Sequence, residues 1–396
     1  MNKNTTLLLM FGGDMSMRNC FFYLIIFISL FCSCQDSSVD SIGGDVLHVD
    51  LDKKVHPFDE IFSRAEIIPL ETVDSSLIVW IKEVVPVGDK LFVHDDWALK
   101  LHVFSNEGKY KHKISRRGQA SNEYLNMQDC VIDTLNNDIY MLSIFGRVKR
   151  FSLDGTFKDE ALLPSRPHYY SMELLGDKYM VTWSCLEKED GGVLVLDRHT
   201  ADTLGSYWHD DRMFDNQQYS PFFLNDGKMF FATALRQQVY EVSESGLLPA
   251  YQWDFGKYNI RESTLQYYLN IERPTDRNNK IIDDYGTEQL PFVLHIQRQN
   301  KKYCYVGLQR ETGMRPAMTH VFYDKDKKES LVFDFLDGKK CRMNAPLFWG
   351  EDYILTDVLY DNREFFKSIL SKDEYAKLEA MLEDDNPYLL KLYFKN

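Results

Sequence analysis

The chain has 396 residues, of which 44% are hydrophobic and 14% aromatic, and it carries a formal net charge of −14. This composition is sufficient for a large hydrophobic core. The acidic balance argues against nucleic acid as a partner, because nucleic acid requires a basic face. It also argues against docking of the folded body on an anionic lipid surface.

The N-terminus has the pattern of a secretory signal. Residues 21–31, FFYLIIFISLF, are too few for a membrane-spanning helix, which needs roughly 20 apolar residues, but they fit the apolar region of a signal peptide. A small residue, Ser33, precedes Cys34, as in bacterial lipoprotein signals. We therefore interpret residues 1–33 as a signal peptide and Cys34 as the lipidated first residue of the mature chain. The segment before Met17 fits no signal pattern, which favours a start at Met15 or Met17. The alternative is a plain cleaved signal that leaves Cys34 as an ordinary thiol.

The stretch after Cys34, QDSSVDSIGGD, is polar and rich in Gly and Ser. Such a stretch buries too little apolar surface to fold. We assign residues 34–58 to a flexible tether that holds the body at a membrane through its lipid. The expected location is the cell envelope, at the outer membrane of a Gram-negative bacterium, with the protein as a monomer. The sequence does not indicate which leaflet of that membrane holds the lipid.

An internal repeat organises the rest of the chain. Six segments share a turn of Gly, Asn, Asp or Lys followed by an aromatic-rich strand: 87–95, 135–143, 175–183, 225–233, 299–307 and 348–357. The turn residues tolerate tight hairpin connections, and the strands favour β-branched and aromatic residues. A second hairpin follows most segments and another strand precedes most of them, so each unit holds four short antiparallel strands. The pattern predicts an all-β, six-bladed β-propeller over residues 59–396.

Two small helical insertions interrupt the repeat. Residues 257–290 contain a short helical pattern, RESTLQYYLNI, and a charged loop. Residues 363–385 contain a second helix, in which Ser371 and Glu374 form a capping box. This helix carries one apolar stripe, Tyr375, Leu378, Met381 and Leu382. We interpret the stripe as core packing, with a partner site as the alternative.

Closure of the ring is predicted to involve both ends of the chain. Residues 65–72, AEIIPLET, and 386–396, NPYLLKLYFKN, both have strand patterns. An open ring would leave exposed sheet edges between its first and last blades. We therefore expect the two terminal strands to share the sixth blade, whose inner strands come from 345–358.

Local motifs resemble a known family. They are IIPLET near the start, the run VHDDWALKLHVFSNEGKYKHKISRRGQASNEY, and Asn386–Pro387 before the closing strand. The chain thereby resembles the six-bladed β-propeller lipoproteins of gut-type Gram-negative anaerobes, related to NHL-repeat and TolB-like propellers. Its GQASNEY loop keeps Gly118, Glu123 and Tyr124 of the family pattern, whereas Ala120 and Ser121 replace a Gly and a Pro. From the residues themselves we expect a structural loop, in which Gly permits the turn, Glu123 accepts backbone N–H groups and Tyr124 wedges between blades.

Signatures of catalysis and metal binding are absent from the sequence. It has no G-x-S-x-G elbow, no H-E-x-x-H motif and no P-loop, and its histidines lack metal-ligand spacing. The acidic run 324–329 lacks the spacing of a calcium loop and is expected to be a hairpin turn. The inner strands offer Asp129, Asp133 and Glu173, which form no evident ring. We expect no cofactor, no metal and no catalytic residue; the alternative is a channel site whose ligands are dispersed over several blades.

Four cysteines follow Cys34, namely Cys130, Cys185, Cys304 and Cys341. Their even count in an oxidising compartment allows disulfides. Three of them lie in strand-like runs, where a small buried hydrophobic residue is the ordinary role of Cys. We favour free, mostly buried thiols.

A set of arginines gives the only candidate ligand site. Loops between the second and third strands of each blade, and crossovers between blades, lie on one face of a propeller. Those loops carry Arg116, Arg117, Arg147, Arg166, Arg236, Arg310 and Arg315, with His168 and Trp183 nearby. Guanidinium groups bind carboxylate or sulfate with two donors, and Trp stacks on sugar faces. The same loops hold the acids Asp95, Asp96, Glu187, Glu189, Asp210 and Asp211, so ordinary surface ion pairs are the alternative.

Three functions are compatible with these features, in order of preference. The first is a non-enzymatic module that binds an acidic glycan or a protein on its loop face, and a shallow top lined by aromatic residues and arginines would favour it. The second is a scaffold of an envelope complex, which a large exposed apolar patch would favour. The third is a hydrolase or lyase with a dispersed channel site, which a deep pocket with converging acids would favour.

Overall fold

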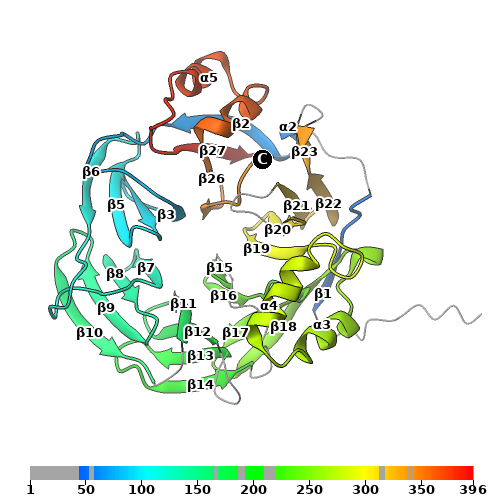
Figure 1. The fold of residues 1–396 in the computed structure, drawn as a ribbon, viewed down its shortest axis with the longest axis horizontal. Helices are drawn as coiled ribbons and strands as arrows, with labels where there is room; N and C mark the ends of the chain where they lie inside the picture. The colour runs from blue at the N-terminus through cyan, green and yellow to red at the C-terminus, as the bar shows by residue number, and fades with distance from the viewer. Residues whose placement is uncertain are drawn as a thin grey trace, which may run out of the picture. The chain divides into compact units, whose positions relative to one another are not determined.

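Six antiparallel sheets follow one another along the chain and form a six-bladed β-propeller (Figure 1). The computed structural model describes residues 44–52, 58–164, 168–185, 192–208, 220–311, 317–336, 339–340 and 342–395. Each of the first five blades is contiguous in sequence, with its strands in the order inner to outer. The predicted fold class is confirmed.

The strands of the first three blades have the following bounds. Blade 1 contains β3 (Ile81–Val87), β4 (Lys90–Asp95), β5 (Lys100–Ser105) and β6 (Tyr110–Ile114). Blade 2 contains β7 (Asp129–Asp133), β8 (Asp138–Leu142), β9 (Arg147–Ser152) and β10 (Phe157–Leu162). Blade 3 contains β11 (His168–Leu175), β12 (Tyr179–Cys185), β13 (Gly192–Asp197) and β14 (Thr203–Tyr207).

The other three blades follow the same plan. Blade 4 contains β15 (Phe222–Asn225), β16 (Lys228–Phe231), β17 (Gln238–Ser243) and β18 (Gly246–Asp254). Blade 5 contains β19 (Val293–Gln299), β20 (Tyr303–Gln309), β21 (Met318–Asp324) and β22 (Glu329–Phe333). Blade 6 contains β25 (Phe348–Trp349), β26 (Tyr353–Val358), β27 (Tyr388–Phe394) and β2 (Phe62–Ile68). A small hairpin, β23 (Phe335–Leu336) with β24 (Lys339–Lys340), follows blade 5.

The antiparallel order gives the disc two distinct faces. The loop face carries the loops between second and third strands and the crossovers between blades. The turn face carries the tight turns between first and second and between third and fourth strands. Several of these turns contain the expected left-handed residues, with φ of +59° at Gly88, +56° at Asn137, +60° at Gly176 and +73° at Gly227.

Both ends of the described chain close the ring through blade 6. The C-terminal β27 lies between β26 and the N-terminal β2, with Ile67 opposite Leu390 and Ile354 opposite Leu392. These residues are all buried, because alternate positions of each strand face the neighbouring blades. The prediction that terminal strands share the sixth blade, with inner strands from 345–358, is confirmed.

A short strand, β1 (Asp45–His48), was not expected from the sequence. It pairs in parallel with the outer strand of blade 4, with Asp45 opposite Tyr251 and His48 opposite Asp254, and makes that sheet five-stranded. Leu47 is 6% exposed and packs in the cluster that contains Tyr251. The assignment of residues 34–58 to a flexible tether is therefore wrong for residues 45–48, which form a strand. They pair with the open edge of the blade 4 sheet, where the apolar side chain of Leu47 becomes buried. The one-turn helix α2 (Phe58–Ile61) leads into β2.

The first insertion is more helical than predicted. It contains a 3₁₀ turn, η1 (Gly256–Tyr258), then α3 (Glu262–Leu269) and α4 (Pro274–Asp283), so the segment interpreted as a charged loop is a helix. Its charges are partly used inside the insertion. Arg277 is 4% exposed and donates to the carbonyls of Tyr268 (3.2 Å) and Ile271 (2.7 Å). The arginine thus satisfies acceptors at the end of α3 that have no partner within the helix.

The second insertion contains η2 (Tyr360–Phe366) and α5 (Lys372–Glu379). Ser371 caps α5 by accepting a hydrogen bond from the Glu374 backbone N–H (3.2 Å). The Glu374 side chain does not complete a capping box, because it accepts from the backbone N–H of Ile67 on β2 instead (2.6 Å). Tyr375, Leu378 and Met381 are buried, which confirms core packing, whereas Leu382 is 67% exposed and does not belong to the core.

The hydrophobic core consists of clusters between adjacent blades rather than one central mass. Between blades 1 and 2, Phe92 and Val103 pack with Ile139 and Phe151. Cys130 and Cys304 are buried free thiols, as expected, and the side chains of Cys185 and Cys341 lie outside the described part of the chain. Within the described ranges, no helix is both long and apolar enough to cross a membrane.

Candidate ligand-binding site

The arginines predicted to bind a ligand lie in loop-face segments, but most that can be described have partners in the protein. Arg147 forms an ion pair with Glu160 (2.5 Å), and Arg236 pairs with Glu262 (3.6 Å) while lying over the Trp208 ring. Arg116 donates from Nε to the carbonyl of Gly155 (3.0 Å). Arg117 is exposed. Arg166 and Arg315 fall outside the described residues.

The two predicted aromatic partners differ in accessibility. Trp183 is 5% exposed and packs at 5.3 Å from the ring of Phe231 between blades 3 and 4, so it cannot stack on a ligand. His168 is exposed at the start of β11, with its ring 6.3 Å from that of Phe145. The sequence did not distinguish the two because both lie at strand ends, where burial depends on the neighbouring blade.

The GQASNEY loop is structural, as its residues indicate. The Glu123 carboxylate accepts from the Ala120 N–H (3.0 Å), and a Cβ at Gly118 would lie 1.9 Å from that carboxylate. A side chain at position 118 would therefore displace the Glu123 carboxylate from this place. Tyr124 is buried between blades 1 and 2 and donates to the carbonyl of Leu99 (2.8 Å).

One predicted arginine, Arg310, lines a large cavity. The cavity has a volume of 1180 Å³ and lies between the first insertion and blade 5. Its floor is the turn after α4, where Gly286 has φ +76° and a Cβ would lie 2.4 Å from the Arg310 carbonyl oxygen. Glycine at this position lets the insertion approach the backbone of blade 5. The cavity lining includes Arg261, Tyr267, Glu288, Arg310 and Glu311.

Two guanidinium groups of this cavity are available to a ligand. Arg261 and Arg310 are exposed, and neither forms an ion pair with another described residue. Other charges of the lining are already engaged, since Lys257 pairs with Asp52 (2.5 Å) and Asp284 pairs with Lys280 (2.6 Å). Hydrogen bonds from Lys257 and Tyr258 lower the pKa of Asp52, and the charge of Arg310 adds a smaller contribution.

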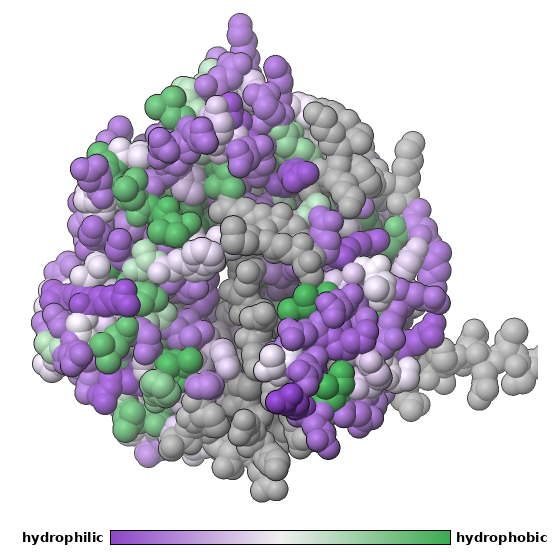
Figure 2. All heavy atoms as spheres, viewed as in Figure 1, coloured by the Kyte–Doolittle hydropathy of each residue, from purple (hydrophilic) through white to green (hydrophobic). Residues whose placement is uncertain are grey.

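Aromatic and acidic groups complete this cavity. Tyr267 is 44% exposed and offers a flat ring. Glu288 is exposed, and Glu311 accepts from the Ala317 N–H (3.1 Å). Figure 2 shows mainly hydrophilic surface over α3 and α4. The arrangement suits a polar ligand that has both a flat face and negative charges.

A second group of polar side chains lies among the inner strands around the channel. The Lys82 ammonium donates to Asp129 (3.0 Å), and Asp129 also accepts from the Ser171 hydroxyl (2.8 Å) and the Met172 N–H (2.8 Å). Burial opposes the charge on Lys82, but the carboxylates of Asp129 and Asp96 outweigh it and raise its pKa. Lys82 therefore remains a cation.

Two glutamates of this channel group have raised pKa values. Burial, with a smaller contribution from Asp129, raises the pKa of Glu83 to about 7. Burial also raises the pKa of Glu173 to about 8, although a hydrogen bond from Leu174 opposes the shift. In the described part of the chain, no three His, Cys, Asp or Glu side chains are placed to hold a metal ion. The sequence contains one signal for this group. An inner strand of a propeller is expected to be mainly apolar, yet residues 81–85, IKEVV, include the charged Lys82 and Glu83.

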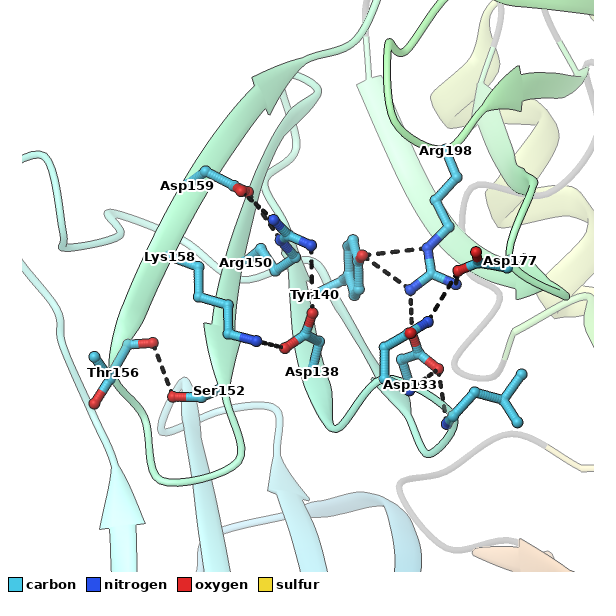
Figure 3. Close-up of polar contacts among 12 residues, drawn as sticks. Asp133, Asp138, Tyr140, Arg150, Ser152, Thr156, Lys158, Asp159, Asp177 and Arg198 are labelled. Carbon is cyan, nitrogen blue, oxygen red and sulfur yellow. Dashed lines mark hydrogen bonds and ion pairs between the residues drawn. The ribbon is translucent and has the colours of Figure 1, made fainter.

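Asp133, the third acid named from the sequence, lies elsewhere. It forms a buried ion pair with Arg198, which also contacts the Tyr140 hydroxyl, and this network joins blades 2 and 3 near the turn face (Figure 3). Burial alone would raise the pKa of Asp133, but the hydrogen bonds from Arg198 and Asn136 lower it. Its role is structural.

Blade 1 exposes a rigid aromatic pair on the loop face. The rings of Trp80 and Trp97 stack at 5.7 Å, and Trp97 is 61% exposed. The buried Asp95 carboxylate holds both segments, because it accepts from the N–H groups of Val79 (2.8 Å), Trp80 (3.1 Å) and Ala98 (3.2 Å). Figure 2 shows hydrophobic surface over blades 1 and 2 in the same view.

The fold defines the chain as a six-bladed propeller with four-stranded blades. It belongs to the family described as a domain of unknown function, DUF4934, which it matches over residues 47–393. No curated protein matches its sequence.

Two solved structures illustrate the fold. One, from Bacteroides fragilis NCTC 9343, is provisionally named an exported protein; it has 15% identity and a TM-score of 0.70, with 89% of this chain and 100% of that chain covered. A member of the DUF4221 family from Bacteroides vulgatus ATCC 8482 has 9% identity and a TM-score of 0.51, with 86% and 99% covered. At these identities the likeness shows the fold alone.

Proposed function

We propose that this protein is a lipid-anchored propeller of the cell envelope that binds an acidic glycan in the cavity between the first insertion and blade 5, without catalysis. The observation that carries the proposal is the pair Arg261 and Arg310, both exposed and free of ion pairs within the described structure, in a cavity of 1180 Å³. Such a volume is ample for an oligosaccharide segment, since ligand sites typically measure about 300–1,000 Å³.

The chemistry of the lining matches a sugar acid. Each guanidinium group offers parallel N–H donors to a carboxylate or sulfate. The exposed ring of Tyr267 offers an apolar face to the C–H groups of a sugar ring. The carboxylate of Glu288 accepts hydrogen bonds from sugar hydroxyls. Because the protein carries a net charge of −14, two arginines that form no ion pair with any described residue supply in one cavity the local attraction that the protein as a whole does not.

The envelope location rests on the N-terminal signal. The apolar run before Ser33 and Cys34 supports acylation of Cys34, and the NHL- and TolB-like lipoprotein resemblance is consistent with it. The similar B. fragilis structure is provisionally named an exported protein, and this name is consistent with secretion of the present chain. We propose a monomer at the outer membrane of a Gram-negative bacterium, with the membrane and a glycan as its partners and no role for nucleic acid.

The test is binding of the mature protein to a panel of acidic and neutral oligosaccharides, measured by calorimetry. Each of Arg261→Ala and Arg310→Ala should weaken binding of the best acidic ligand by about tenfold or more, because a hydrogen bond to a charged group contributes about 1.5–3 kcal/mol. Arg147→Ala is the matched control on the same face, since Arg147 already pairs with Glu160. Equal loss in all three variants, or binding of neutral glycans only, would contradict the assignment.

A protein partner is the second candidate function, favoured by the exposed and rigid Trp80–Trp97 pair. Exposed aromatic side chains held in one conformation are typical centres of protein interfaces. If the protein bound no glycan but retained an envelope protein in a pull-down, Trp97→Ala should abolish that retention while Arg310→Ala should not. Retention by both variants would exclude this surface.

A further inference from the structure

The direction of β1 shows toward which face of the propeller its N-terminal end points. The inner strands run from the loop face to the turn face, so the fourth strand of a blade runs from the turn face to the loop face. β1 is parallel to β18, the fourth strand of blade 4, with Asp45 opposite Tyr251 and His48 opposite Asp254. The N-terminal end of β1 therefore points toward the turn face.

The turn face of blade 5 has an unusual charge. Its two turns, 300–302 and 325–328, read NKK and KDKK and contain five lysines and one aspartate. In blades 1 to 4 the corresponding turns contain at most one lysine each. Blade 5 is also the blade next to β1, which contacts β22.

These lysines form one continuous patch. The Lys325 N–H donates to the Lys302 carbonyl (2.9 Å), and the Lys302 ammonium reaches the Lys395 carbonyl (2.5 Å). The side chain of Lys327 is 64% exposed, and its ammonium lies 3.9 Å from Asp324 and 4.0 Å from Glu329. Asp324, just before the second turn, is buried and accepts from the N–H groups of that turn, so it contributes little to the exposed surface. We call Lys301, Lys302, Lys325, Lys327, Lys328 and Lys395 the blade 5 lysine patch.

Four acids lie in or beside the patch, and two of them are engaged with its lysines. Asp326 lies within the second turn, Glu329 follows that turn with its side chain 44% exposed, and Glu351 and Asp352 lie in the neighbouring turn of blade 6. The Glu351 carboxylate accepts from the Lys301 N–H (3.0 Å). The net charge of −14 argues against membrane contact by the whole body, but the fold places this lysine-rich surface on the face toward which the N-terminal end of β1 points.

We propose that the blade 5 lysine patch rests on the anionic headgroups of the membrane that holds the Cys34 lipid, so that the loop face points away from that membrane. This inference rests on the lipid anchor of the proposed function. Residues 35–44 connect the lipid to the propeller and span at most about 35 Å when fully extended. That length keeps the turn face within reach of the headgroups, where each lysine near an anionic surface adds to the attraction.

The orientation can be measured by fluorescence quenching on vesicles. The acylated full chain carries a fluorophore at Asp326→Cys on the turn face or at Arg117→Cys on the loop face, with the unsubstituted protein as the blank for native thiols. Vesicles of phosphatidylethanolamine and phosphatidylglycerol contain a lipid with a nitroxide on its headgroup. We expect quenching several-fold stronger at position 326 than at position 117. The difference should shrink in high salt, in phosphatidylcholine vesicles, and when Lys301→Glu, Lys327→Glu and Lys328→Glu are combined.

The possible outcomes separate the two proposals. Mass spectrometry that finds Cys34 without lipid would end both the anchor and the orientation. An acylated protein that binds glycan normally but shows equal quenching at the two positions, or stronger quenching at 117, would overturn the orientation alone. Quenching at 326 that does not respond to the three charge reversals would exclude the lysine patch as its cause. Circular dichroism of the triple variant checks that its fold is intact.

Discussion

At the residue scale, burial decides what the charged side chains of this protein can do. Glu83 and Glu173 sit on inner strands beside other acids, and burial raises their pKa values to about 7 and about 8. His94 is also buried, and burial lowers its pKa to about 3, so its ring is neutral. Lys82 stays charged because the carboxylate of Asp129 lies 3.0 Å from its ammonium.

The two glutamates predict a particular dependence of stability on pH. An acid whose pKa is higher in the folded than in the unfolded state binds more protons when folded, so stability falls as pH rises. The loss should begin near the unfolded pKa of about 4.5 and be complete above the folded values of about 7 and 8. In thermal unfolding between pH 5 and 9, Glu83→Gln and Glu173→Gln should each flatten the decline. Glu272→Gln, at an exposed position, is the control, and an unchanged slope in both test variants would refute the prediction.

At the scale of the strands and blades, contacts between neighbouring sheets hold the elements in place. Blades 2 and 3 are joined by the ion pair of Arg198 and Asp133, whose side chains are 2% and 5% exposed (Figure 3). Arg198 also donates to the Tyr140 hydroxyl (2.9 Å) and to the Gly176 carbonyl (3.0 Å). The network thus connects the ends of three strands, at Asp133, Gly176 and Arg198, which lie tens of residues apart in the sequence.

Loss of this ion pair should be costly, unlike loss of an exposed one. Arg198→Ala leaves a buried carboxylate without its cation, and we expect the free energy of unfolding to fall by about 3–5 kcal/mol. Arg147→Ala removes an exposed pair with Glu160 and should cost about 0–1 kcal/mol. Urea unfolding of both variants measures the difference. Similar small losses would mean that the Arg198 pair contributes little net stability.

At the scale of the whole molecule, closure of the ring makes the blades interdependent. β27 pairs with β26 on one side and with β2 on the other, so residues near both chain ends share one sheet. Without this strand, blades 1 and 5 would each face an incomplete neighbour, and the clusters between them would open to water. A defect in β27 should therefore destabilise the propeller as a unit.

Leu390 on β27 is the position that tests closure. It is fully buried, and Leu390→Ala should lower the free energy of unfolding by about 2–5 kcal/mol through lost packing and the cavity left behind. Leu382→Ala, at a 67% exposed position in the adjacent insertion, should change it by less than about 0.5 kcal/mol. Denaturant unfolding followed by fluorescence and by circular dichroism should give coincident transitions for Leu390→Ala. Separate transitions would show that blade 6 unfolds independently.

Local patterns were enough to predict the fold and several of its details. The turn-plus-strand repeat predicted six blades because hairpin turns and alternating strands are encoded within short stretches. The closing strands, the cap at Ser371 and the roles of Glu123 and Tyr124 followed from the same short-range chemistry. The charged segment that proved to be α4 was missed, because its polar surface hides the helical period.

The accessibility of individual side chains depended on the assembled ring. Trp183 and Arg310 both lie at strand ends in the sequence, yet one packs between blades and the other lines a cavity. Three further features depend on which elements lie side by side in the folded chain. They are the ion pair of Arg147 with Glu160, the parallel pairing of β1 with β18, and the ion pair of Lys82 with Asp129. A sequence encodes which residue types alternate along a strand, but burial, charge pairing and pKa shifts depend on which strand lies opposite, and that is settled only when the sheets pack around the channel.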